Sequence, residues 1–437
     1  MRSWIVSRLK LVIEFISALR PFVAIAIGLF VVLAVVSVVR GGFGLLHHEE
    51  EAAPVDTKSY SPLEKRIARA RPGDLIDVAE GVYPISHPMR IRSRGVTLKG
   101  AAKGRTVLDF TRQVSGNQAL EIAAPDVLIA DLTLRNAYGD GIVVANTQRV
   151  SLRRIRVDWT SRRQPLPGAV GVHLLHVEDA LIDRVDVYGA ADAGMYLGKS
   201  RQVIVQASVA AASVTGLVIA NCEFVDVMRS LFTHNSLGVV VVNLPNLPDA
   251  ISNSVRILHN RIVDNNLSNA PARDVVLGKL PAGTGIAVIA HDRVAIFDND
   301  ISDNPAAGVL IASYLFTGLT YQDPTFDPYA ESLHVYNNRF ARNGLAPTAD
   351  TLKLVNSELP PGFGVDVARD GFSDDHKLVN GRVPEALRIC LHDNMRGNGA
   401  AHFVDLDAIE DYSRPATDAR PFACRQPPLR EVLITPR

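Results

Sequence analysis

The sequence is poor in cysteine. Three cysteines are present among 437 residues, namely Cys222, Cys390 and Cys424. That is too few for a disulfide framework or for a cysteine-based metal site. We expect Cys222 to be reduced and packed in the interior. The sequence leaves open whether Cys390 and Cys424 pair, since that requires the tail of the chain to fold back.

Net charge and aromatic residues are also scarce. Lys plus Arg equal Asp plus Glu at 46 each, so the formal net charge is zero. This excludes a nucleic-acid-binding protein that works by neutralising phosphates, and we expect no nucleic-acid partner. Phe, Trp and Tyr make up 6% of the chain, which argues against a broad aromatic platform for sugar rings.

A short phrase recurs in place of any helical pattern. It starts at Val255, Val294 and Leu333, with apolar residues at its positions 1, 3 and 8 and Asn at positions 6 and 11. A second phrase follows each copy and begins with glycine, at Gly285, Gly308 and Gly364. The apolar spacing is two and never 3.6, as in short strands.

The same frame runs back through the chain. Position 1 falls at Val127, Val150, Ala180, Val203 and Val225, and the glycine phrase starts at Gly141, Gly171, Gly194, Gly216 and Gly238. The shortest intervals, about 22 residues, hold three strands and three turns. The sequence therefore predicts an all-β fold, a right-handed single-stranded parallel β-helix of roughly ten to twelve coils. We expect it to be an elongated monomer.

Two asparagine ladders follow from this frame, because equal positions on successive coils stack at roughly 4.8 Å. The first comprises Asn260, Asn299, Asn338 and Asn394, and the second Asn235, Asn265, Asn304 and Asn343. Stacked amides hydrogen-bond along the axis, so we assign both ladders a structural role.

The N-terminal region carries an export signal. Residues 22–39 contain no charge, and the segment before them holds Arg2, Arg8, Lys10 and Arg20 against Glu14. We predict a cytoplasmic basic segment (1–21), a transmembrane anchor (22–40), a linker (41–60), the β-helix (61–409) and a tail that caps the far end (410–437). The protein would be a single-pass protein of the bacterial inner membrane with its β-helix in the periplasm. A cleaved signal peptide is the alternative.

A short helix is predicted at the start of the β-helix. Ser61 is followed by Pro62 and, three residues after the cap, by Glu64. This is the pattern of a capping box with proline in the first turn. We expect the helix to cover the open end of the first coil.

Two sets of motifs resemble known families. Residues 70–83, 96–100 and 106–110 resemble the opening coils of the pectate-lyase-like superfamily. Residues 158–160, 191–200, 243–248 and 281–286 resemble a family of exported bacterial parallel β-helix proteins without an assigned activity. The second resemblance implies a c-type cytochrome-like exported partner. Residues 167–173 and 215–221 depart from that family's pattern by lacking an acidic side chain and aromatic ones, so a catalytic surface there would be incomplete.

Long polar insertions interrupt the later coils. They span residues 314–331, 346–361 and 371–386 and are rich in Pro, Asp and Thr. Loops on one flank of a solenoid commonly build a binding site, and we predict one here.

Charged residues alternate between neighbouring coils at frame positions 4 and 7, which we expect to point outward on one sheet. Arg153 is followed by Asp183 at position 4 and Arg156 by Asp186 at position 7, and Arg261, Asp300 and Arg339 alternate farther along. One interpretation is structural, since opposite charges one strand apart stabilise a wet sheet face.

The same region offers the groups that a uronate lyase or epimerase needs, a base and a cation beside the sugar carboxylate. The candidate catalytic residues are Asp158, Asp186, Asp192 and Lys199, accompanied by Asp183 and Arg201. Asp140 precedes Gly141, and His173 would be a general base if its strand turns it outward. The alternative for His173 is a packed or surface role.

The candidate binding residues are Trp159, Arg153, Arg156, His173 and Tyr196. Trp159 lies in an insertion between two coils, where it either offers a ring to a sugar or packs on the flank of the solenoid. Neither Asp-Pro-His-Asp of alginate epimerases nor Arg-x-Pro-x-x-Arg of pectate lyases is present. We therefore predict no metal site and no cofactor, with Ca²⁺ possible but without a clear site.

Three functions stay open at this point. The first is a scaffold that binds a polysaccharide or a periplasmic protein partner along one sheet and its loops. The second is a polysaccharide-modifying enzyme, either a uronate lyase, a C5-epimerase or a glycosidase. The third is an accessory protein to an exported redox partner. Two carboxylates with a basic residue in one cleft would favour the enzyme, and a flat face of alternating charge would favour the scaffold.

Overall fold

The computed structural model describes residues 60–160, 164–247, 253–267 and 275–435. The predicted cytoplasmic segment, the predicted anchor at residues 22–40 and nearly all of the linker lie outside the described residues. None of the helices in the described ranges has the length and apolar character needed to cross a membrane. Residues 60–437 form one compact unit.

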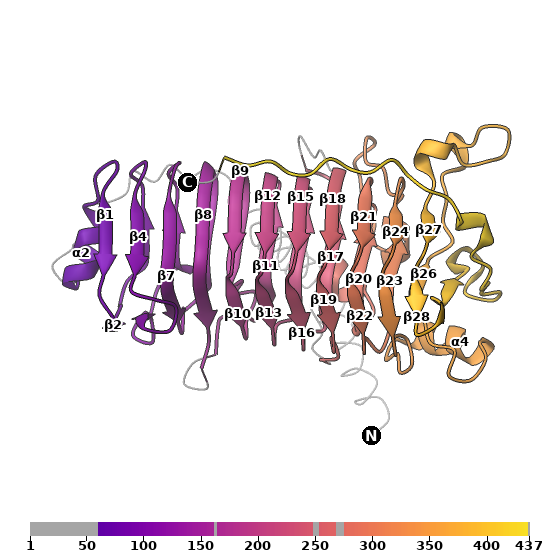
Figure 1. Ribbon diagram of the computed structural model, residues 1–437, viewed down its shortest axis with the longest axis horizontal. Helices are drawn as coiled ribbons and strands as arrows, with labels where there is room; N and C mark the ends of the chain where they lie inside the picture. Colours follow the sequence, from indigo (N-terminus) through magenta and orange to yellow (C-terminus); the bar gives the residue numbers. More distant parts are fainter. Residues whose placement is uncertain (1–59, 161–163, 248–252, 268–274, 436–437) are drawn as a thin grey trace, which may run out of the picture. The chain divides into compact units, whose positions relative to one another are not determined.

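Three parallel sheets run along the unit, and each coil contributes one strand to each sheet (Figure 1). Sheet 1 consists of β1 (Leu75–Val78), β4 (Thr97–Gly100), β7 (Leu128–Arg135), β8 (Asp140–Asp158), β9 (Val172–Asp183), β12 (Arg201–Gln206), β15 (Glu223–Met228), β18 (Asn253–Leu258), β21 (Val294–Phe297), β24 (His334–Tyr336) and β27 (Cys390–His392).

Sheet 2 consists of β2 (Gly81–Pro84), β5 (Thr106–Asp109), the ends of β7 and β8, then β10 (Asp186–Tyr188), β13 (Val209–Ala211), β16 (Leu231–Thr233), β19 (Arg261–Val263), β22 (Asp300–Ser302), β25 (Arg339–Ala341) and β28 (Met395–Arg396). Strand β29 (Gly399–Ala400) pairs antiparallel with β28.

Sheet 3 consists of β3 (Met89–Ile91), β6 (Gln118–Ile122), the beginnings of β8 and β9, then β11 (Ala193–Gly198), β14 (Thr215–Ala220), β17 (Leu237–Val242), β20 (Thr284–Ile289), β23 (Ala307–Ala312), β26 (Val367–Arg369) and β30 (Phe403–Asp405). Each sheet thus has eleven levels in the described part of the chain, which agrees with the predicted ten to twelve coils.

The register confirms most of the sequence frame. Val203 pairs with Ala180 and Val225, and Val225 pairs with Val255, as position 1 requires. The glycine phrase is wrong at its last member. Val309 pairs with Val367, so Asp366 rather than Gly364 takes the place after Gly308. Positions 4 and 7 lie on two sheets and not on one, because the turn at positions 5 and 6 separates them.

The glycine column has a steric cause. A Cβ on Gly194 would lie 2.8 Å from the carbonyl oxygen of Gly216, and one on Gly238 would lie 2.3 Å from that of Gly285. From Gly141 to Gly308 the backbone of one coil therefore approaches the next too closely for a side chain at this position, whereas Ala119 and Asp366 occupy it at the two ends of the column.

Both asparagine ladders are confirmed. Asn260 Nδ2 donates to Asn299 Oδ1 at 3.1 Å, and the same contact continues through Asn338 to Asn394. In the second ladder, Asn235, Asn265, Asn304 and Asn343 are linked in the same way, each contact at 3.0 Å. Serines continue the first ladder toward the N-terminus, since Ser230 N donates to Asn260 Oδ1 and Ser208 N to Ser230 Oγ.

Helix α2 (Pro62–Ala68) lies beside β1 at one end of the stack (Figure 1). Ser61 and Glu64 form the capping box, and Leu63 and Ile67 are buried in the inner core. The remaining helical segments are short and lie in the loops: α3 (Val276–Lys279), η2 (Tyr314–Thr317), α4 (Asp350–Glu358), η3 (Asp375–Lys377), η4 (Glu385–Leu387), η5 (Ala408–Glu410) and η6 (Arg420–Phe422).

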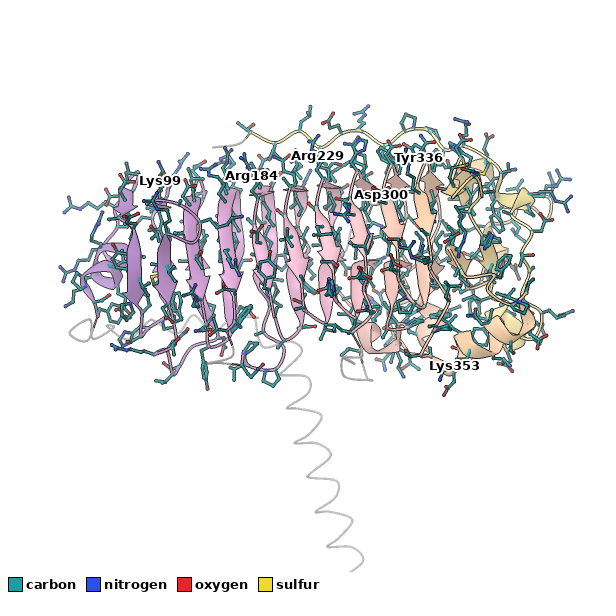
Figure 2. The ribbon with its side chains drawn as sticks, turned by 60° about the horizontal axis from the view of Figure 1, so that its bottom comes forward. Lys99, Arg184, Arg229, Asp300, Tyr336 and Lys353 are labelled. Carbon is teal, nitrogen blue, oxygen red and sulfur yellow. A yellow bond between two sulfur atoms is a disulfide. The ribbon has the colours of Figure 1, made fainter. Side chains whose placement is uncertain are left out.

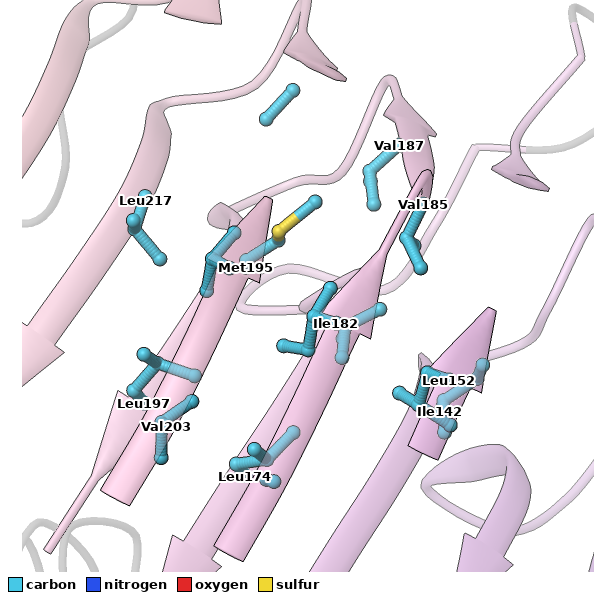
Figure 3. Packing of buried hydrophobic residues seen from close by; sticks show 14 of the residues in the cluster. Ile142, Leu152, Leu174, Ile182, Val185, Val187, Met195, Leu197, Val203 and Leu217 are labelled. Atoms are coloured by element: carbon cyan, nitrogen blue, oxygen red, sulfur yellow. The ribbon is translucent and has the colours of Figure 1, made fainter. Parts of the chain in front are cut away.

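Two apolar regions hold the unit together. The inner core runs through the coils, where Leu174, Leu197 and Met195 stack between the sheets (Figure 3). A second apolar cluster lies on the outer face of sheet 3; it includes Val170 and Ala193, and Tyr196 on β11 packs against it. Val240 and Leu310 point outward there but are buried, because the long loops of the later coils pack over them. Elsewhere charged side chains such as Lys99 and Asp300 stand on the surface (Figure 2).

The tail does more than cover the last coil. Cys390 and Cys424 form a disulfide, which settles the pairing that the sequence left open. Beyond it the chain runs back along the strands of sheet 1 (Figure 1), where Val432 N donates to Asp226 Oδ2 at 3.1 Å. Cys222 is free and buried, as expected.

Candidate functional site

Two of the four candidate catalytic residues are held in ion pairs on sheet 2. Asp158 ends β8, is 7% exposed, and accepts hydrogen bonds from Arg156 Nε at 2.7 Å and Arg135 Nε at 3.4 Å. Asp186 accepts from Lys103 Nζ at 2.5 Å. Both carboxylates already have cationic partners, so their contacts are those of an ion-paired sheet face.

The predicted arginines belong to the same framework. Arg156 lies opposite Asp186 in sheet 2, and its guanidinium sits 4.7 Å from the ring centre of Tyr188. Arg153 lies opposite Asp183, but in sheet 1. Asp183 accepts from Gln206 Nε2 and pairs with Arg184. Arg201 pairs with Glu178 at 3.7 Å.

Trp159 packs on the flank of the solenoid. Its ring lies against the inner core, and its Nε1 donates to the carbonyl oxygen of Ala137 at 2.8 Å. Since both the apolar and the polar part of the side chain are engaged, the packing interpretation fits better than the sugar platform. Lys199 lies in the turn after β11, where its backbone N donates to Ala220 O.

The structure brings the other candidates together on the outer face of sheet 3. His173 on β9 and Tyr196 on β11 are neighbours in register, and their rings meet edge to face at 5.0 Å. Asp140, the first residue of β8, places Oδ2 2.9 Å from His173 Nδ1. Asp192 lies in the turn just before β11. His173, Tyr196, Asp140 and Asp192, called the sheet 3 cluster below, are all half-buried.

Local structure explains how each member is placed. The second carboxylate oxygen of Asp140 accepts from Val170 N at 2.8 Å, which ties the loop before β9 to the start of β8. The backbone N of Asp192 donates to Ala169 O at 3.0 Å in the same loop. Gly198 makes room for the phenol ring, since a Cβ there would lie 2.8 Å from Tyr196 Cε1.

Burial and charge set the protonation of two members. Burial, reinforced by the charge of Asp140, raises the pKa of the Asp192 carboxyl. Burial raises the pKa of Tyr196 to about 12, so its phenol keeps its proton at neutral pH. His173 Nδ1 must carry a proton, because the Asp140 carboxylate can only accept. Nε2 is then the ring's basic nitrogen in the neutral form.

A second group of titratable residues lies near the other end of the unit. Asp292, Asp327 and Glu331 bring their carboxylates within 4.8 Å of one another. Lys377 Nζ contacts Asp327 and lies 2.7 Å from Glu331. Burial, together with the charge of Asp327, raises the pKa of Asp292 to about 7. The ammonium of Lys377 supplies the positive charge that these carboxylates require.

Two of the three insertions predicted to build a binding site, residues 314–331 and 371–386, line a cavity, and residues 346–361 do not line it. It measures about 550 Å³ and is lined by the loops before β24 and after β26 and by the tail near Phe422. Sequence reasoning located these loops but not the individual lining residues, because their distance along the chain hides their proximity.

Comparison with known proteins shows the fold. Residues 140–319 match the family model described as right handed beta helix region. The mannuronan C-5 epimerase AlgE4 A-module of Azotobacter vinelandii is similar in structure, at 15% identity, 74% of this chain, 87% of that chain and a TM-score of 0.47. Pectate lyase Pel9A is 13% identical over 77% of this chain and 72% of that chain, with a TM-score of 0.42.

The surface adhesin PfbA of Streptococcus pneumoniae is also similar, at 9% identity, 64% of this chain, 84% of that chain and a TM-score of 0.41. No curated protein sequence matches the chain. At these identities the similarities concern the fold alone. The family match agrees with the right-handed parallel β-helix that the sequence predicts.

Proposed function

We propose that this chain, which folds as a right-handed parallel β-helix, acts on an acidic polysaccharide by proton abstraction at the sheet 3 cluster. The contact between His173 Nδ1 and Asp140 Oδ2, on an outward-facing strand beside Tyr196, carries this proposal. It corresponds to the second of the three functions considered from the sequence, a uronate lyase or C5-epimerase.

The cluster holds the groups that this chemistry needs. His173 Nε2 takes the proton from the carbon beside the uronate carboxylate, and Asp140 orients the ring and stabilises the imidazolium that forms. Tyr196 keeps its proton and donates it, either to the departing glycosidic oxygen in a lyase or to the opposite face of the carbon in an epimerase.

Asp192 has a further use in this site. Burial and the charge of Asp140 raise the pKa of the Asp192 carboxyl, and in its protonated form this carboxyl can donate a hydrogen bond to the substrate carboxylate. That bond strengthens as negative charge develops on the substrate during proton abstraction. Of the four candidate catalytic residues, Asp158, Asp186, Asp192 and Lys199, this proposal retains Asp192 alone.

The register defines where a polysaccharide would lie. Arg90, Glu121, Val143, His173 and Tyr196 form one outward row along sheet 3, spaced at roughly 4.8 Å. Beyond Tyr196 the row continues as Val218 and Val240, which the outer apolar cluster covers. We therefore place the substrate along the first coils, parallel to the axis, with its reacting residue next to His173.

The test is a turnover screen on the full chain with alginate and polygalacturonate, set against neutral glycans. Unsaturated-uronate absorbance reports a lyase, and exchange of solvent deuterium into the sugar reports an epimerase. We expect His173→Ala and Tyr196→Phe each to lower kcat by about 100-fold or more. His176→Ala is the matched control, because His176 follows on the same strand outside the cluster.

Loss of activity in both His173→Ala and His176→Ala would point to a folding defect rather than to catalysis. Equal activity of wild type and His173→Ala would refute the assignment of the base. Absence of turnover on every acidic glycan would remove the enzyme proposal altogether.

A scaffold role is the second candidate, and one observation favours it. Arg261, Asp300 and Arg339 lie opposite one another on three successive strands of sheet 2, a face of alternating charge. Such a face suits a partner that presents the complementary pattern. Glycan binding without turnover would support a carbohydrate scaffold. If neither glycan binding nor turnover is found, the partner to be sought is a periplasmic protein, including a c-type cytochrome-like one.

The cellular location is part of the proposal as well. The uncharged segment at residues 22–39, preceded by basic residues, supports an inner-membrane anchor with the β-helix in the periplasm. A C-terminal fusion to alkaline phosphatase should be active and membrane-bound. An inactive fusion would contradict export, and a soluble periplasmic one would indicate a cleaved signal peptide.

A further inference from the structure

The cavity of about 550 Å³ lies at the end of the unit far from the sheet 3 cluster. Its walls come from the loop before β24, the loop after β26 and the tail segment η6. The strands next to it, β26 and β27, lie about five coils from β11, which corresponds to roughly 24 Å along the axis. This volume is typical of a site for a small molecule.

Covalent and ionic contacts fix the walls in place. The Cys390–Cys424 disulfide holds the tail against the last coil, and Phe422 packs on Phe403 with ring centres 4.8 Å apart. Arg369 donates to Asp405 Oδ2 at 2.7 Å, and its guanidinium carbon lies 5.7 Å from the ring centre of Phe422. These contacts hold the tail segment around Phe422 in place as one wall of the cavity.

The charges that line the cavity are not balanced. Arg369 and Lys377 have carboxylate partners, Asp405 for the first and Asp327 and Glu331 for the second. Arg382 and Arg388 have no carboxylate within ion-pair distance among the residues that the structure describes. Arg388 Nε donates to Val383 O at 3.3 Å, and the other guanidinium N–H groups of Arg382 and Arg388 are available for an anion from outside.

The rest of the lining suits a sugar. Tyr329, Phe372 and Phe422 offer ring surface to an apolar face. Glu331 Oε2 accepts from Lys377, and Asp374 Oδ1 accepts from the backbone N of His376, so each carboxylate accepts hydrogen bonds from sugar hydroxyl groups only through its remaining lone pairs. An apolar face, several hydroxyls and one carboxylate together describe a uronic acid.

We propose that this cavity is a second, non-catalytic binding site for a uronic acid residue, with its carboxylate held by Arg382 and Arg388. The source of that residue is either a free monosaccharide or the end of an acidic polysaccharide. The site does not depend on turnover at the sheet 3 cluster, because it shares none of the cluster's residues. It would keep a polysaccharide or a released product on the protein.

Calorimetric titration of the full chain tests the proposal. D-galacturonate and D-glucuronate are each titrated against the neutral counterpart, D-galactose or D-glucose, so that only the carboxylate differs. We expect measurable binding of the acids and binding of the neutral sugars that is at least about tenfold weaker. Comparison with polygalacturonate distinguishes the two sources, since a chain-end ligand binds more tightly than the monomer.

Variants locate the binding. Arg382→Ala/Arg388→Ala should weaken uronate binding by about tenfold or more, and both side chains are exposed, so the fold is preserved. Cys424→Ser should weaken it by freeing the wall that carries Phe422. His173→Ala should leave it unchanged, so failure of the proposed activity and failure of this site give different results.

Three outcomes would overturn the inference. One is equal affinity for acidic and neutral sugars, which would remove the role of the arginines. Another is binding that survives in the double arginine variant but disappears in His173→Ala, which would move the site to sheet 3. The third is the absence of uronate binding in a folded protein with an intact disulfide.

Discussion

Removal of one amide from the middle of the first asparagine ladder should destabilise the β-helix more than any surface change. Asn299 is 1% exposed. Its Nδ2 donates to Ile257 O at 2.8 Å and Asn338 Oδ1 at 2.9 Å. Its Oδ1 accepts from the backbone N and from Nδ2 of Asn260, at 2.9 and 3.1 Å.

Asn299→Ala leaves three buried groups without their partners, namely the backbone N–H of Asn260, one Nδ2 hydrogen of Asn260 and the carbonyl oxygen of Ile257. Each unpaired buried group costs about 1 to 3 kcal/mol, so we expect a loss of about 3 to 9 kcal/mol in the free energy of unfolding. Water cannot restore these bonds, because the ladder lies inside the coil turn.

Asn394→Ala is the matched control. Asn394 ends the same ladder, is half-buried and has a ladder partner on one side only, Asn338. Water can replace its contacts, so we expect a loss of about 1 kcal/mol. Urea unfolding of both variants, followed by far-UV circular dichroism, measures the difference. If Asn299→Ala lowers the free energy of unfolding by no more than Asn394→Ala does, the buried ladder does not stabilise the β-helix as argued.

Two further predictions concern the glycine column and the buried acidic group. Gly238→Ala should lower the urea midpoint of unfolding strongly, because its Cβ would lie 2.3 Å from Gly285 O. Gly399→Ala is the control and should have little effect, because the nearest atom to its Cβ would be 3.8 Å away. Equal midpoints for the two variants would contradict the steric explanation. Burial raises the pKa of Asp292 in the folded state to about 7, above its usual 3.8, so the native state binds a proton that the unfolded state does not, and stability falls as pH rises from about 4 to about 7. Asp292→Asn should flatten that part of the pH–stability curve, and an unchanged slope would rule out Asp292 as its source.

The sheet 3 cluster shows how much of a candidate site can be predicted from the sequence. His173, Tyr196 and Asp192 were candidates on chemical grounds, and Asp140 was noted only for its place before Gly141. What joins Asp140 to the others is register, since Ile142 pairs with Val172 and Val172 with Met195. Asp140 immediately precedes Gly141 and Asp192 lies two residues before Gly194, so both lie close to the start of a glycine phrase, which was the signal available in the sequence.

Asp158 and Asp186 show the opposite case. Asp186 lies opposite Arg156, as position 7 requires, and Asp158 had no assigned position in the frame; the ion-pair partners of the two carboxylates were not predicted. Lys103, which pairs with Asp186, lies 83 residues earlier in the chain. A frame that lists outward positions does not say which long cationic side chain reaches across from a turn.

The sequence by itself determined the fold, because a solenoid repeats one local rule. Alternating apolar residues recur at every coil, and a glycine where backbones touch and an asparagine or serine in a turn recur over runs of successive coils; all are local features. The functional surface was decided only in three dimensions. One outward row of sheet 3 contains both His173 and Val240. Loops that do not follow the repeat decide that the row is covered at Val240 and partly exposed at His173. The cavity near Phe422 depends on a disulfide between residues 34 positions apart and on side chains from three separate segments. Such contacts arise from packing between distant parts of the chain, and no spacing in the sequence encodes them.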